Sequence, residues 1–397
     1  MTTSQRPMRI LQAHSRHATR GGADHVIDRE RELLVAAGHD VEQYFTAPAS
    51  GPGVKQAAAA VWNVQAARDI RDKIRAWQPD VLHVHTPFPT LSPAVFWAAH
   101  AEGVATVGTV HSYRYSCIAA TLRRDGHICE DCIASPLKLP GVRHRCYKDS
   151  VAASAVMTTS LNLHRGIGTF TRRVGCFLTM TDFARHLLIR DGIPEQRIRV
   201  KPNCMDDPGE PVPFEEREPV VLFVGRLVQE KGITALLSAW RAVTGDCRLV
   251  VIGDGPLRPE VEAAAAADAT IEFRGWQTEN AVMQAQRTAR LTVVPSEWYE
   301  AGPPLVMLQA LACGTPLVTC DLENVAATAV ASGAAVSFRT GDAASLAGTL
   351  CRVLADPAAG AVMGHAARGL YLRDHTPDTT LEILESTYRS VTRAGVA

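Results

Sequence analysis

The sequence has no run of about twenty apolar residues, the length that a helix needs to span a bilayer. It also has no excess of either charge, because 41 Lys and Arg residues balance 41 Asp and Glu residues. A neutral chain does not attract a polyanion at long range. Nucleic acid is therefore a poor candidate partner, and a small ligand is a better one.

The first residues lack the apolar core and the small-residue cleavage site of a secretory signal peptide. We therefore expect a cytoplasmic protein whose contact with membranes is at most peripheral, because an amphipathic helix leaves a weaker trace than a span. The sequence carries no signal for a particular oligomeric state.

What the sequence does contain is a repeated alternation of apolar strands, glycine-bearing loops and amphipathic helices, in 397 residues of which 46% are hydrophobic. This alternation predicts βαβ units, with parallel sheets covered by helices on both faces. A first helix is expected over residues 23–37. The expected strands are residues 8–13, 41–46, 81–85 and 105–111 in the first half, and 220–225, 248–253, 271–275, 291–295 and 316–320 in the second.

A proline-rich, acidic stretch at residues 202–219 indicates a linker between two domains. The fold class predicted is α/β, with two doubly wound, Rossmann-like domains facing each other across a cleft. Ligands of such sheets bind outside the carboxyl ends of the strands, so the site is expected between the domains. The N-terminal domain is expected to comprise residues 1–205, with a cysteine-rich insert at about 117–150. The C-terminal domain is expected to comprise residues 206–376, followed by a last helix, residues 377–397, that packs back on the N-terminal domain.

Two basic residues follow the strand at residues 220–225. Arg226 and Lys231 lie in the loop before the next helix, where a guanidinium fork and an ammonium group can bind one oxyanion, as a diphosphate requires. The Gly-Asp-Gly turn at residues 253–255 lets the backbone approach a ligand closely. Solvated surface charges and a plain turn are the alternatives, but the position at strand ends favours a binding site.

The segment EWYEAGPPLVMLQALACGTP, residues 297–316, follows another expected strand. Its helix is expected to begin at Pro303 or Pro304 and to direct free amides and the positive end of its dipole toward an anion. Glu300 stands in the loop, where it can accept hydrogen bonds from sugar hydroxyls. Gln309 lies more than one helical turn farther on.

The N-terminal half offers glycine and histidine at corresponding places. Gly22 opens the first helix and allows close approach of a phosphate or an acceptor. His111 ends a strand at the expected edge of the sheet and is a candidate site residue. His83 and His85 alternate along one strand and share a face. No third ligand is evident beside them, so packing or hydrogen bonding explains them better than a metal ion.

The ordered series FVGRLVQEKG, VIGDGPL and PSEWYEAGPPLVMLQALACGTPLV resembles the donor-nucleotide half of the family 4 retaining glycosyltransferases, which have the GT-B fold. GGAD, PDVLHVHTPFP, TVHSY and VKPN are similar to N-terminal motifs of that family, so the resemblance covers nearly the whole chain. The resemblance implies transfer of a hexose-type sugar from a nucleoside-diphosphate sugar, most often a UDP- or GDP-sugar, to a hydroxyl of a glycan, a lipid-linked acceptor or a small molecule.

The same resemblance assigns roles to residues. His111 and Glu300 are the implied catalytic residues, beside the transferred sugar and its hydroxyls. Arg226 and Lys231 are implied to bind the diphosphate, and amides around Leu305 the distal phosphate. No Asp-x-Asp pair occurs in the sequence, so we expect catalysis without a metal cofactor. The implied donor-binding residues are Gly22, Arg226, Lys231, Gly302, Leu305 and Gln309.

Gln309 departs from the family pattern, which has a second glutamate for the ribose hydroxyls. Eight residues, rather than the usual seven, separate it from Glu300. An amide can still accept and donate hydrogen bonds, but the loss of charge weakens donor binding by about 1 kcal/mol. Two rival functions stay open: a nucleotide-sugar epimerase on the same fold, which uses no acceptor, and a non-catalytic nucleotide-sugar-binding protein.

The insert contains Cys117, Cys129, Cys132 and Cys146, with one Cys-x-x-Cys motif. Four thiolates can form a tetrahedral structural zinc site, and a long loop without its own core gains most from such a clip. Unligated, reduced thiols and redox switching by Cys129 and Cys132 are the alternatives. All three interpretations place the insert directly after His111, where it is expected to border the acceptor pocket.

Overall fold

The computed structural model describes residues 6–16, 21–47 and 53–394. The chain forms two compact units: unit 1 comprises Met1–Pro202 and Thr380–Ala397, and unit 2 comprises Asn203–Thr379. The first residues of the expected N-terminal domain and residues 395–397 of the expected last helix lie outside the described residues.

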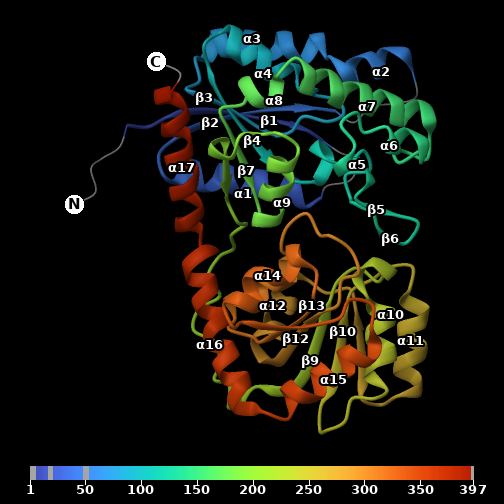
Figure 1. Ribbon diagram of the computed structural model, residues 1–397. Helices are drawn as coiled ribbons and strands as arrows, with labels where there is room; N and C mark the ends of the chain where they lie inside the picture. The colour runs from blue at the N-terminus through green and yellow to red at the C-terminus, as the bar shows by residue number, and fades with distance from the viewer. Residues whose placement is uncertain (1–5, 17–20, 48–52, 395–397) are drawn as a thin grey trace. The chain divides into compact units, whose positions relative to one another are not determined.

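Unit 1 is built on a six-stranded parallel sheet with the strand order β2-β1-β3-β4-β7-β8 (Figure 1). The strands are rich in Val, Ile and Leu and buried, as parallel strands covered on both faces are. His111 was expected to end a strand, but β4 ends at Val110 and His111 begins the next loop. The strands are β1 (Arg9–Ser15), β2 (Asp40–Thr46), β3 (Val81–Thr86), β4 (Ala105–Val110), β7 (Cys176–Thr179) and β8 (Ile198–Val200).

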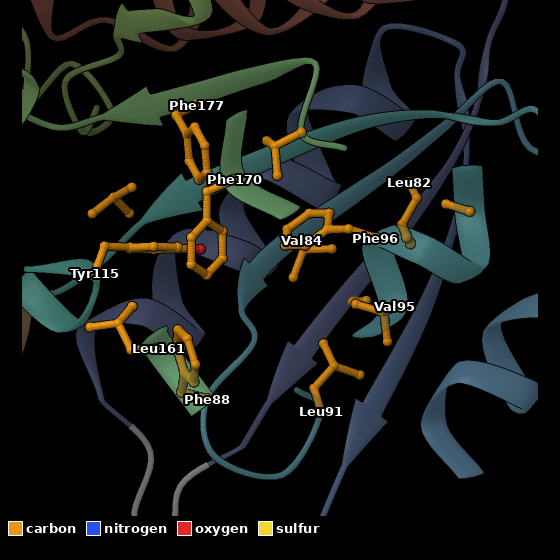
Figure 2. Packing of buried hydrophobic residues seen from close by; sticks show 14 of the residues in the cluster. Leu82, Val84, Phe88, Leu91, Val95, Phe96, Tyr115, Leu161, Phe170 and Phe177 are labelled. Atoms are coloured by element: carbon orange, nitrogen blue, oxygen red, sulfur yellow. The ribbon is translucent and has the colours of Figure 1, made fainter. Parts of the chain in front are cut away.

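Alternation along the central strands divides the core of unit 1 into two layers. In one layer, Leu82 and Val84 of β3 pack against helices α3 (Val64–Trp77), α4 (Ala94–Ala101) and α7 (Val151–Gly166). Figure 2 shows the aromatic side chains of this layer. The ring of Tyr115 meets Phe170 and Phe177 edge to face, with centroids 5.2 and 5.3 Å apart.

The other layer lies under helices α1 (Gly22–Ala36) and α17 (Pro377–Ala394). Leu384, Tyr388 and Val391 of α17 pack with strand residues on the face of the sheet opposite to Leu82. Because His83 and His85 alternate with Leu82 and Val84, they point into this second layer. The remaining helices of unit 1 outside the insert are α2 (Val54–Val61), α8 (Thr169–Arg172) and α9 (Asp182–Arg190).

The cysteine-rich insert contains more regular structure than the sequence predicts. A two-residue turn at Asp125 and Gly126, both with positive φ, joins two very short strands into a hairpin. Elements of two to four residues have no measurable period, which is why periodicity misses them. The elements are a 3₁₀ turn at Tyr113–Tyr115, β5 (Arg123–Arg124), β6 (His127–Ile128), α5 (Asp131–Ala134) and α6 (Pro140–Arg143).

Unit 2 is a second six-stranded parallel sheet with the order β11-β10-β9-β12-β13-β14. Its last strand is not among the strands predicted from the sequence. The strands are β9 (Glu218–Val224), β10 (Arg248–Ile252), β11 (Ile271–Gly275), β12 (Ala289–Val294), β13 (Leu317–Cys320) and β14 (Ala335–Phe338). The helices are α10 (Ile233–Trp240), α11 (Arg258–Ala267), α12 (Glu279–Thr288), α13 (Leu305–Ala312), α14 (Glu323–Ala331), α15 (Ala343–Leu354) and α16 (Pro357–Asp374).

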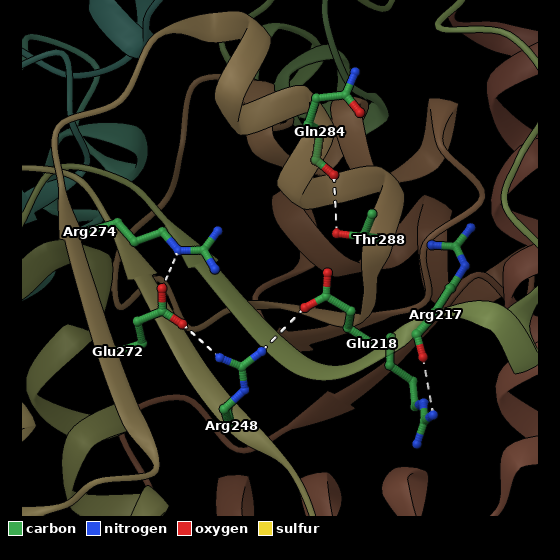
Figure 3. A network of polar contacts seen from close by, with 8 residues as sticks. Arg217, Glu218, Arg248, Glu272, Arg274, Gln284 and Thr288 are labelled. Atoms are coloured by element: carbon green, nitrogen blue, oxygen red, sulfur yellow. Dashed lines mark hydrogen bonds and ion pairs between the residues drawn. The ribbon is translucent and has the colours of Figure 1, made fainter.

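Charged residues at the amino ends of these strands pair with one another (Figure 3). Arg248 bridges Glu218 at 3.2 Å and Glu272 at 2.9 Å, and Arg274 donates to Glu272 at 2.7 Å. These pairs are half exposed, so each stabilises the sheet by less than about 1 kcal/mol. Arg248 and Arg274 thus have carboxylate partners.

Within the described parts of the chain, no single helix is long and apolar enough to cross a bilayer. Only α15 taken together with Pro357–Arg393, across a bend of 98°, meets the length and composition limits.

Candidate active site

The strand order of unit 2 reverses between β9 and β12. In chain order, β10 and β11 follow β9 on one side of the sheet, and β12 then lies on the other side of β9. The carboxyl ends of strands at such a reversal are where open α/β sheets bind ligands. The loop after β9 carries Arg226 and Lys231, and the loop after β12 carries Glu300.

Lys231 and Glu300 meet at this reversal. The Nζ atom of Lys231 lies 2.5 Å from Oε1 of Glu300. Ser296 donates to the same carboxylate oxygen at 3.0 Å, and the Nδ2 atom of Asn324 donates to the backbone carbonyl of Glu300. Glu300 is only 9% exposed, and the ring of Trp298 lies beside Lys231, 5.9 Å from the ring centroid to Nζ. The carboxylate is therefore held in place before any ligand arrives.

Two glycines bring the loops of this edge together. Gly232 has φ +72°, and a Cβ atom there would collide with the backbone carbonyl of Pro295. Gly253 has φ +145°, and a Cβ atom there would collide with the carbonyl of Gly225. Only glycine permits these contacts without strain. The turn that follows β10 thus lies directly against the turn that carries Arg226.

Arg226 differs from the arginines in Figure 3. Its side chain is exposed, and no described residue forms an ion pair or side-chain hydrogen bond with its guanidinium group. Arg248, at the opposite edge of the same sheet, has two carboxylate partners. A cation left unpaired beside the Lys231–Glu300 pair is available to an anionic ligand.

Helix α13 begins after both prolines, which corrects the sequence prediction. Pro304 is the N-cap, with ψ 145°, and Leu305 is the first helical residue. The first hydrogen bond of the helix runs from the N–H of Met307 to the carbonyl of Pro304 at 2.9 Å. The prolines therefore remove no donor from the helix, and the N–H groups of Leu305 and Val306 remain at its positive end. Gln309 is buried one turn farther on, and Gly302 lies in the preceding loop.

In unit 1, the corresponding edge holds a group of buried polar residues. His111 follows β4, and its Nε2 atom lies 3.0 Å from Nδ1 of His85. His83 is bonded on both sides, to Thr109 at 2.7 Å and to Tyr388 of α17 at 2.8 Å. The two histidines that share a face are thus hydrogen-bonded within the second core layer.

Beneath the histidines lies an ion pair that the sequence did not reveal. Lys201 Nζ is 2.8 Å from Oε1 of Glu30, and both side chains are almost completely buried. Burial alone would raise the pKa of Glu30, but the charge and the hydrogen bond of Lys201 lower it overall, so the carboxylate is ionised. Burial lowers the pKa of His83 and His85 well below the usual value, and that of His111 to about 3. These imidazoles are neutral at physiological pH.

The position of Glu30 selects the tautomer of His111. Oε2 of Glu30 lies 3.7 Å from Nε2 of His85 and favours a proton there. Nδ1 of His85 then accepts a hydrogen bond from the Nε2–H of His111, which leaves Nδ1 of His111 as an acceptor. A neutral His111 can accept a hydrogen bond from a hydroxyl group of a ligand.

Glu30, His83 and His85 form the only group of three potential metal ligands, among the described residues, whose ligand atoms lie within 4.8 Å of one another. His83 is hydrogen-bonded through both ring nitrogens, and Glu30 faces the ammonium of Lys201, which would repel a cation. Glu30 is a third potential ligand that the sequence did not show beside His83 and His85, but the repulsion by Lys201 makes hydrogen bonding a better account of the group than a metal ion.

Gly22 lies at the start of α1, with Gly21 as N-cap. The N–H of Gly21 donates to the carboxylate of Asp24 at 2.9 Å, and that carboxylate lies 3.5 Å from Nε2 of His14 in β1. Both glycines are exposed, and a Cβ atom at either would meet nothing within 4 Å. The packing of unit 1 does not require glycine here, which is consistent with close approach of a ligand.

The four cysteines of the insert surround one small cavity, of about 10 Å³. They come from the loop after the 3₁₀ turn (Cys117), the end of the hairpin (Cys129), α5 (Cys132) and the loop after α6 (Cys146). All four are free thiols. Burial raises the pKa of Cys132, and that of Cys146 to about 11, so these are not the low-pKa thiolates of redox enzymes.

Sequence reasoning missed Glu30, Lys201 and Asn324. Lys201 stands inside the VKPN motif, which was a usable signal, but Glu30 looks like one more charge on a helix until the sheet brings it to Lys201.

Comparison with known proteins places both units in one family. Residues 20–207 match "Glycosyltransferase Family 4", and residues 218–356 match "Glycosyl transferases group 1". The chain is 30% identical to the 2-deoxystreptamine glucosyltransferase of Streptomyces kanamyceticus, over 52% of this chain and 55% of the relative. It is 26% identical to the glycogen synthase of Mycobacterium tuberculosis, over 80% of this chain and 70% of the relative. The chain thus spans about half to two thirds of the length of these relatives.

Among solved structures, HepE of Anabaena in complex with UDP has a TM-score of 0.68 at 15% identity, with 96% of this chain and 100% of that chain covered. Such a likeness shows the fold. The two family matches show that this chain belongs to the family 4 glycosyltransferases, and the two parallel sheets and the solved structure show that it has the GT-B fold.

Proposed function

We propose that the chain is a retaining glycosyltransferase that transfers a sugar from a nucleoside-diphosphate sugar, UDP- or GDP-linked, to a hydroxyl of an acceptor. The observation that carries the proposal is the ion pair between Lys231 and Glu300 at the strand reversal of unit 2, with the unpaired Arg226 on the same edge. The cations of Arg226 and Lys231 suit the diphosphate of the donor, and the positioned carboxylate of Glu300 suits its sugar.

In this proposal, Lys231 and Arg226 bind the diphosphate oxygens, and the N–H groups of Leu305 and Val306 bind the phosphate nearest the sugar. Negative charge grows on that phosphate as its bond to the sugar breaks. The two cations and the helix terminus stabilise that charge, which is the task that a divalent ion performs in other transferases. The absence of an Asp-x-Asp pair from the sequence is consistent with catalysis without a metal ion.

The reaction then proceeds on one face of the sugar. The acceptor oxygen forms a bond to the anomeric carbon on the face that the diphosphate leaves, so the anomeric configuration is kept. The proton of the acceptor hydroxyl passes to the departing phosphate oxygen, and the electron pair of the broken bond remains on the diphosphate. Glu300 accepts hydrogen bonds from sugar hydroxyls, and the neutral His111 accepts one through Nδ1.

The names of two relatives suggest acceptors for the test. Curated relatives are named for transfer to 2-deoxystreptamine and to inositol 3-phosphate, both polyhydroxylated rings. We include these two compounds in the acceptor panel, beside glycan and lipid-linked acceptors.

The test has two steps. A thermal-shift panel of UDP-, GDP-, ADP- and TDP-sugars with the full-length protein identifies the donor, because a ligand that binds only the native state raises the unfolding midpoint. Turnover of that donor with the acceptor panel is then followed by NMR of the product. A product with the donor's anomeric configuration supports the proposal. An inverted product refutes retention, and an epimer formed from the donor alone shows an isomerase.

A further inference from the structure

The segment 112–150, which includes the cysteine-rich insert, is held in unit 1 by two anchors, and Ile118 and Cys132 between them also reach the core. Tyr115 packs into the aromatic layer of Figure 2. Lys138 is fully buried and lies 2.5 Å from Asp191, which also pairs with Arg165 at 2.9 Å. Cys117, Cys129 and Cys132 lie between these two anchors in the chain, and Cys146 follows them.

The backbone of the insert is costly to hold. Positive φ is uncommon outside glycine, because the Cβ atom crowds the backbone. Most of the non-glycine residues with positive φ in the described chain belong to this one segment: Ala120, Leu122, Asp125, Lys138, Arg145, Lys148 and Asp149. Such conformations persist only where the surroundings impose them. A hairpin of two-residue strands and two helices of one turn do not supply that constraint.

The four thiols converge where the constraint is needed. Cys117, Cys129, Cys132 and Cys146 all line the same cavity of about 10 Å³, which has room for one water-sized sphere. Cys129 follows the hairpin, and Cys132 lies in the first turn of α5, so the Cys-x-x-Cys motif turns around the cavity as a zinc knuckle does. Cys117 and Cys146 close it from the two ends of the segment.

Two cations lie at the cavity. Arg123 and Arg124 line it together with Asp131, whose carboxylate accepts a hydrogen bond from Arg124 at 2.9 Å. Four thiolates around a divalent ion carry a net charge of about −2. The two guanidinium groups offset part of that charge, as outer-shell groups do around metal sites.

We propose that Cys117, Cys129, Cys132 and Cys146 bind one Zn²⁺ ion that fixes the fold of the insert. Each cysteine binds as a thiolate, so the four thiol protons pass to solvent as the ion enters. Zinc–sulfur bonds of about 2.3 Å place the sulfurs about 3.8 Å apart. In the structure the four sulfurs are not all this close to one another. No three of them lie within 4.8 Å of one another, because Glu30, His83 and His85 are the only described residues with three ligand atoms inside that distance. The sulfurs therefore move inward when the ion binds.

The ion has a structural role in this proposal. Four protein ligands leave no open position for a water molecule or a substrate, so the site is closed in the sense of structural zinc sites. It acts on the segment that begins directly after His111, and the loss of zinc is expected to loosen that segment while unit 2 continues to bind nucleotide.

The test is the zinc content of the full-length protein, purified with reductant and without chelator, measured by mass spectrometry. We expect about one zinc per chain, reduced to less than about a tenth of that in each of Cys117→Ser, Cys129→Ser, Cys132→Ser and Cys146→Ser. Cys204→Ser, which removes a half-buried thiol outside the insert, and His144→Gln, which changes another residue of the cavity wall, are expected to keep the zinc.

A second measurement on the unaltered chain does not depend on how the variants fold. Replacement of zinc by Co²⁺ gives an absorption spectrum whose sulfur-to-metal bands count the thiolates, and four are expected. Zinc-free protein with four reactive thiols and an unchanged unfolding midpoint overturns the proposal. So does a Cys129–Cys132 disulfide in the purified protein, or loss of zinc in His144→Gln with retention in any one of the four serine variants.

Discussion

Replacement of Lys231 by Met tests the proposed donor site most directly. Methionine is unbranched like lysine and one atom shorter, and it carries neither the charge nor the N–H donors. In the native protein the ammonium lies 2.5 Å from Glu300, with the lysine side chain 25% and the glutamate side chain 11% exposed. The variant therefore loses a cation for the diphosphate and leaves a nearly buried carboxylate without that cation.

The magnitude follows from these two losses. A hydrogen bond to a charged group contributes about 1.5–3 kcal/mol. Breaking a fully buried pair costs about 3–5 kcal/mol, and a pair with one member a quarter exposed costs less. We take about 3–4 kcal/mol for the combined loss in the transition state, because the unpaired carboxylate also repels the charge that grows on the phosphate. This corresponds to a fall of about 100- to 1000-fold in kcat/KM.

The assay is release of nucleoside diphosphate from the donor found in the thermal-shift panel, with binding of the free nucleoside diphosphate measured by calorimetry. Arg248→Met is the matched control, since it removes a paired cation at the opposite edge of the same sheet. The double variant Lys231→Met with Glu300→Gln should recover part of the nucleotide binding, because the repulsion is gone, but not the turnover. A stable Lys231→Met variant within threefold of the parent in both measurements refutes the donor site as described.

Three further outcomes are expected. The free energy of unfolding should fall as pH drops from about 6.5 toward 3, because His83, His85 and His111 bind protons in the unfolded chain but not when buried in the folded one. Each histidine lowers the stability by about 1.4 kcal/mol per pH unit. A denaturation profile that is flat between pH 7 and 5 contradicts this prediction. Gly232→Ala should destabilise unit 2 by at least about 2 kcal/mol, since the new Cβ atom would collide with the Pro295 carbonyl. Gly245→Ala is the control, because Gly245 also has a positive φ but a Cβ atom there would meet nothing. Equal unfolding midpoints for the two variants would count against the collision. Gln309→Glu should lower the KM for the donor about fivefold, which corresponds to about 1 kcal/mol of binding free energy. The exposed Gln284, changed to Glu, is the control and should leave this KM unchanged. An unchanged KM in Gln309→Glu means that residue 309 does not contact the ribose.

Much of unit 2 can be predicted from its sequence, because the charged candidate residues lie directly after strands. Arg226 and Lys231 follow β9, and Glu300 follows β12, so the strand pattern alone brings them to one edge. The start of α13 could not be predicted to the residue, since a proline is acceptable both as N-cap and as the first helical residue. The structure resolves this in favour of Leu305.

Unit 1 was less predictable because its site depends on contacts between distant segments. No local sequence pattern distinguishes Glu30 or Lys201, and only the folded unit brings their side-chain Oε1 and Nζ atoms to 2.8 Å. Tyr388 occupies an ordinary buried position of an amphipathic helix, and its contact with His83 follows from the docking of that helix. Hydrophobic periodicity specifies which face of an element is buried, but not which polar atom it meets there.

The polypeptide starts unit 1, leaves it at Pro202, builds all of unit 2 and returns at Thr380. During synthesis, unit 2 is therefore complete in sequence before the ribosome has made the helix that supplies Tyr388 to His83. A nascent chain halted before Thr380 holds every residue proposed to bind nucleotide, yet its first sheet lacks the cover of Leu384, Tyr388 and Val391 and exposes apolar surface. Removal of the last eighteen residues is accordingly a lesion of the first domain, and no single proteolytic cut yields both halves intact.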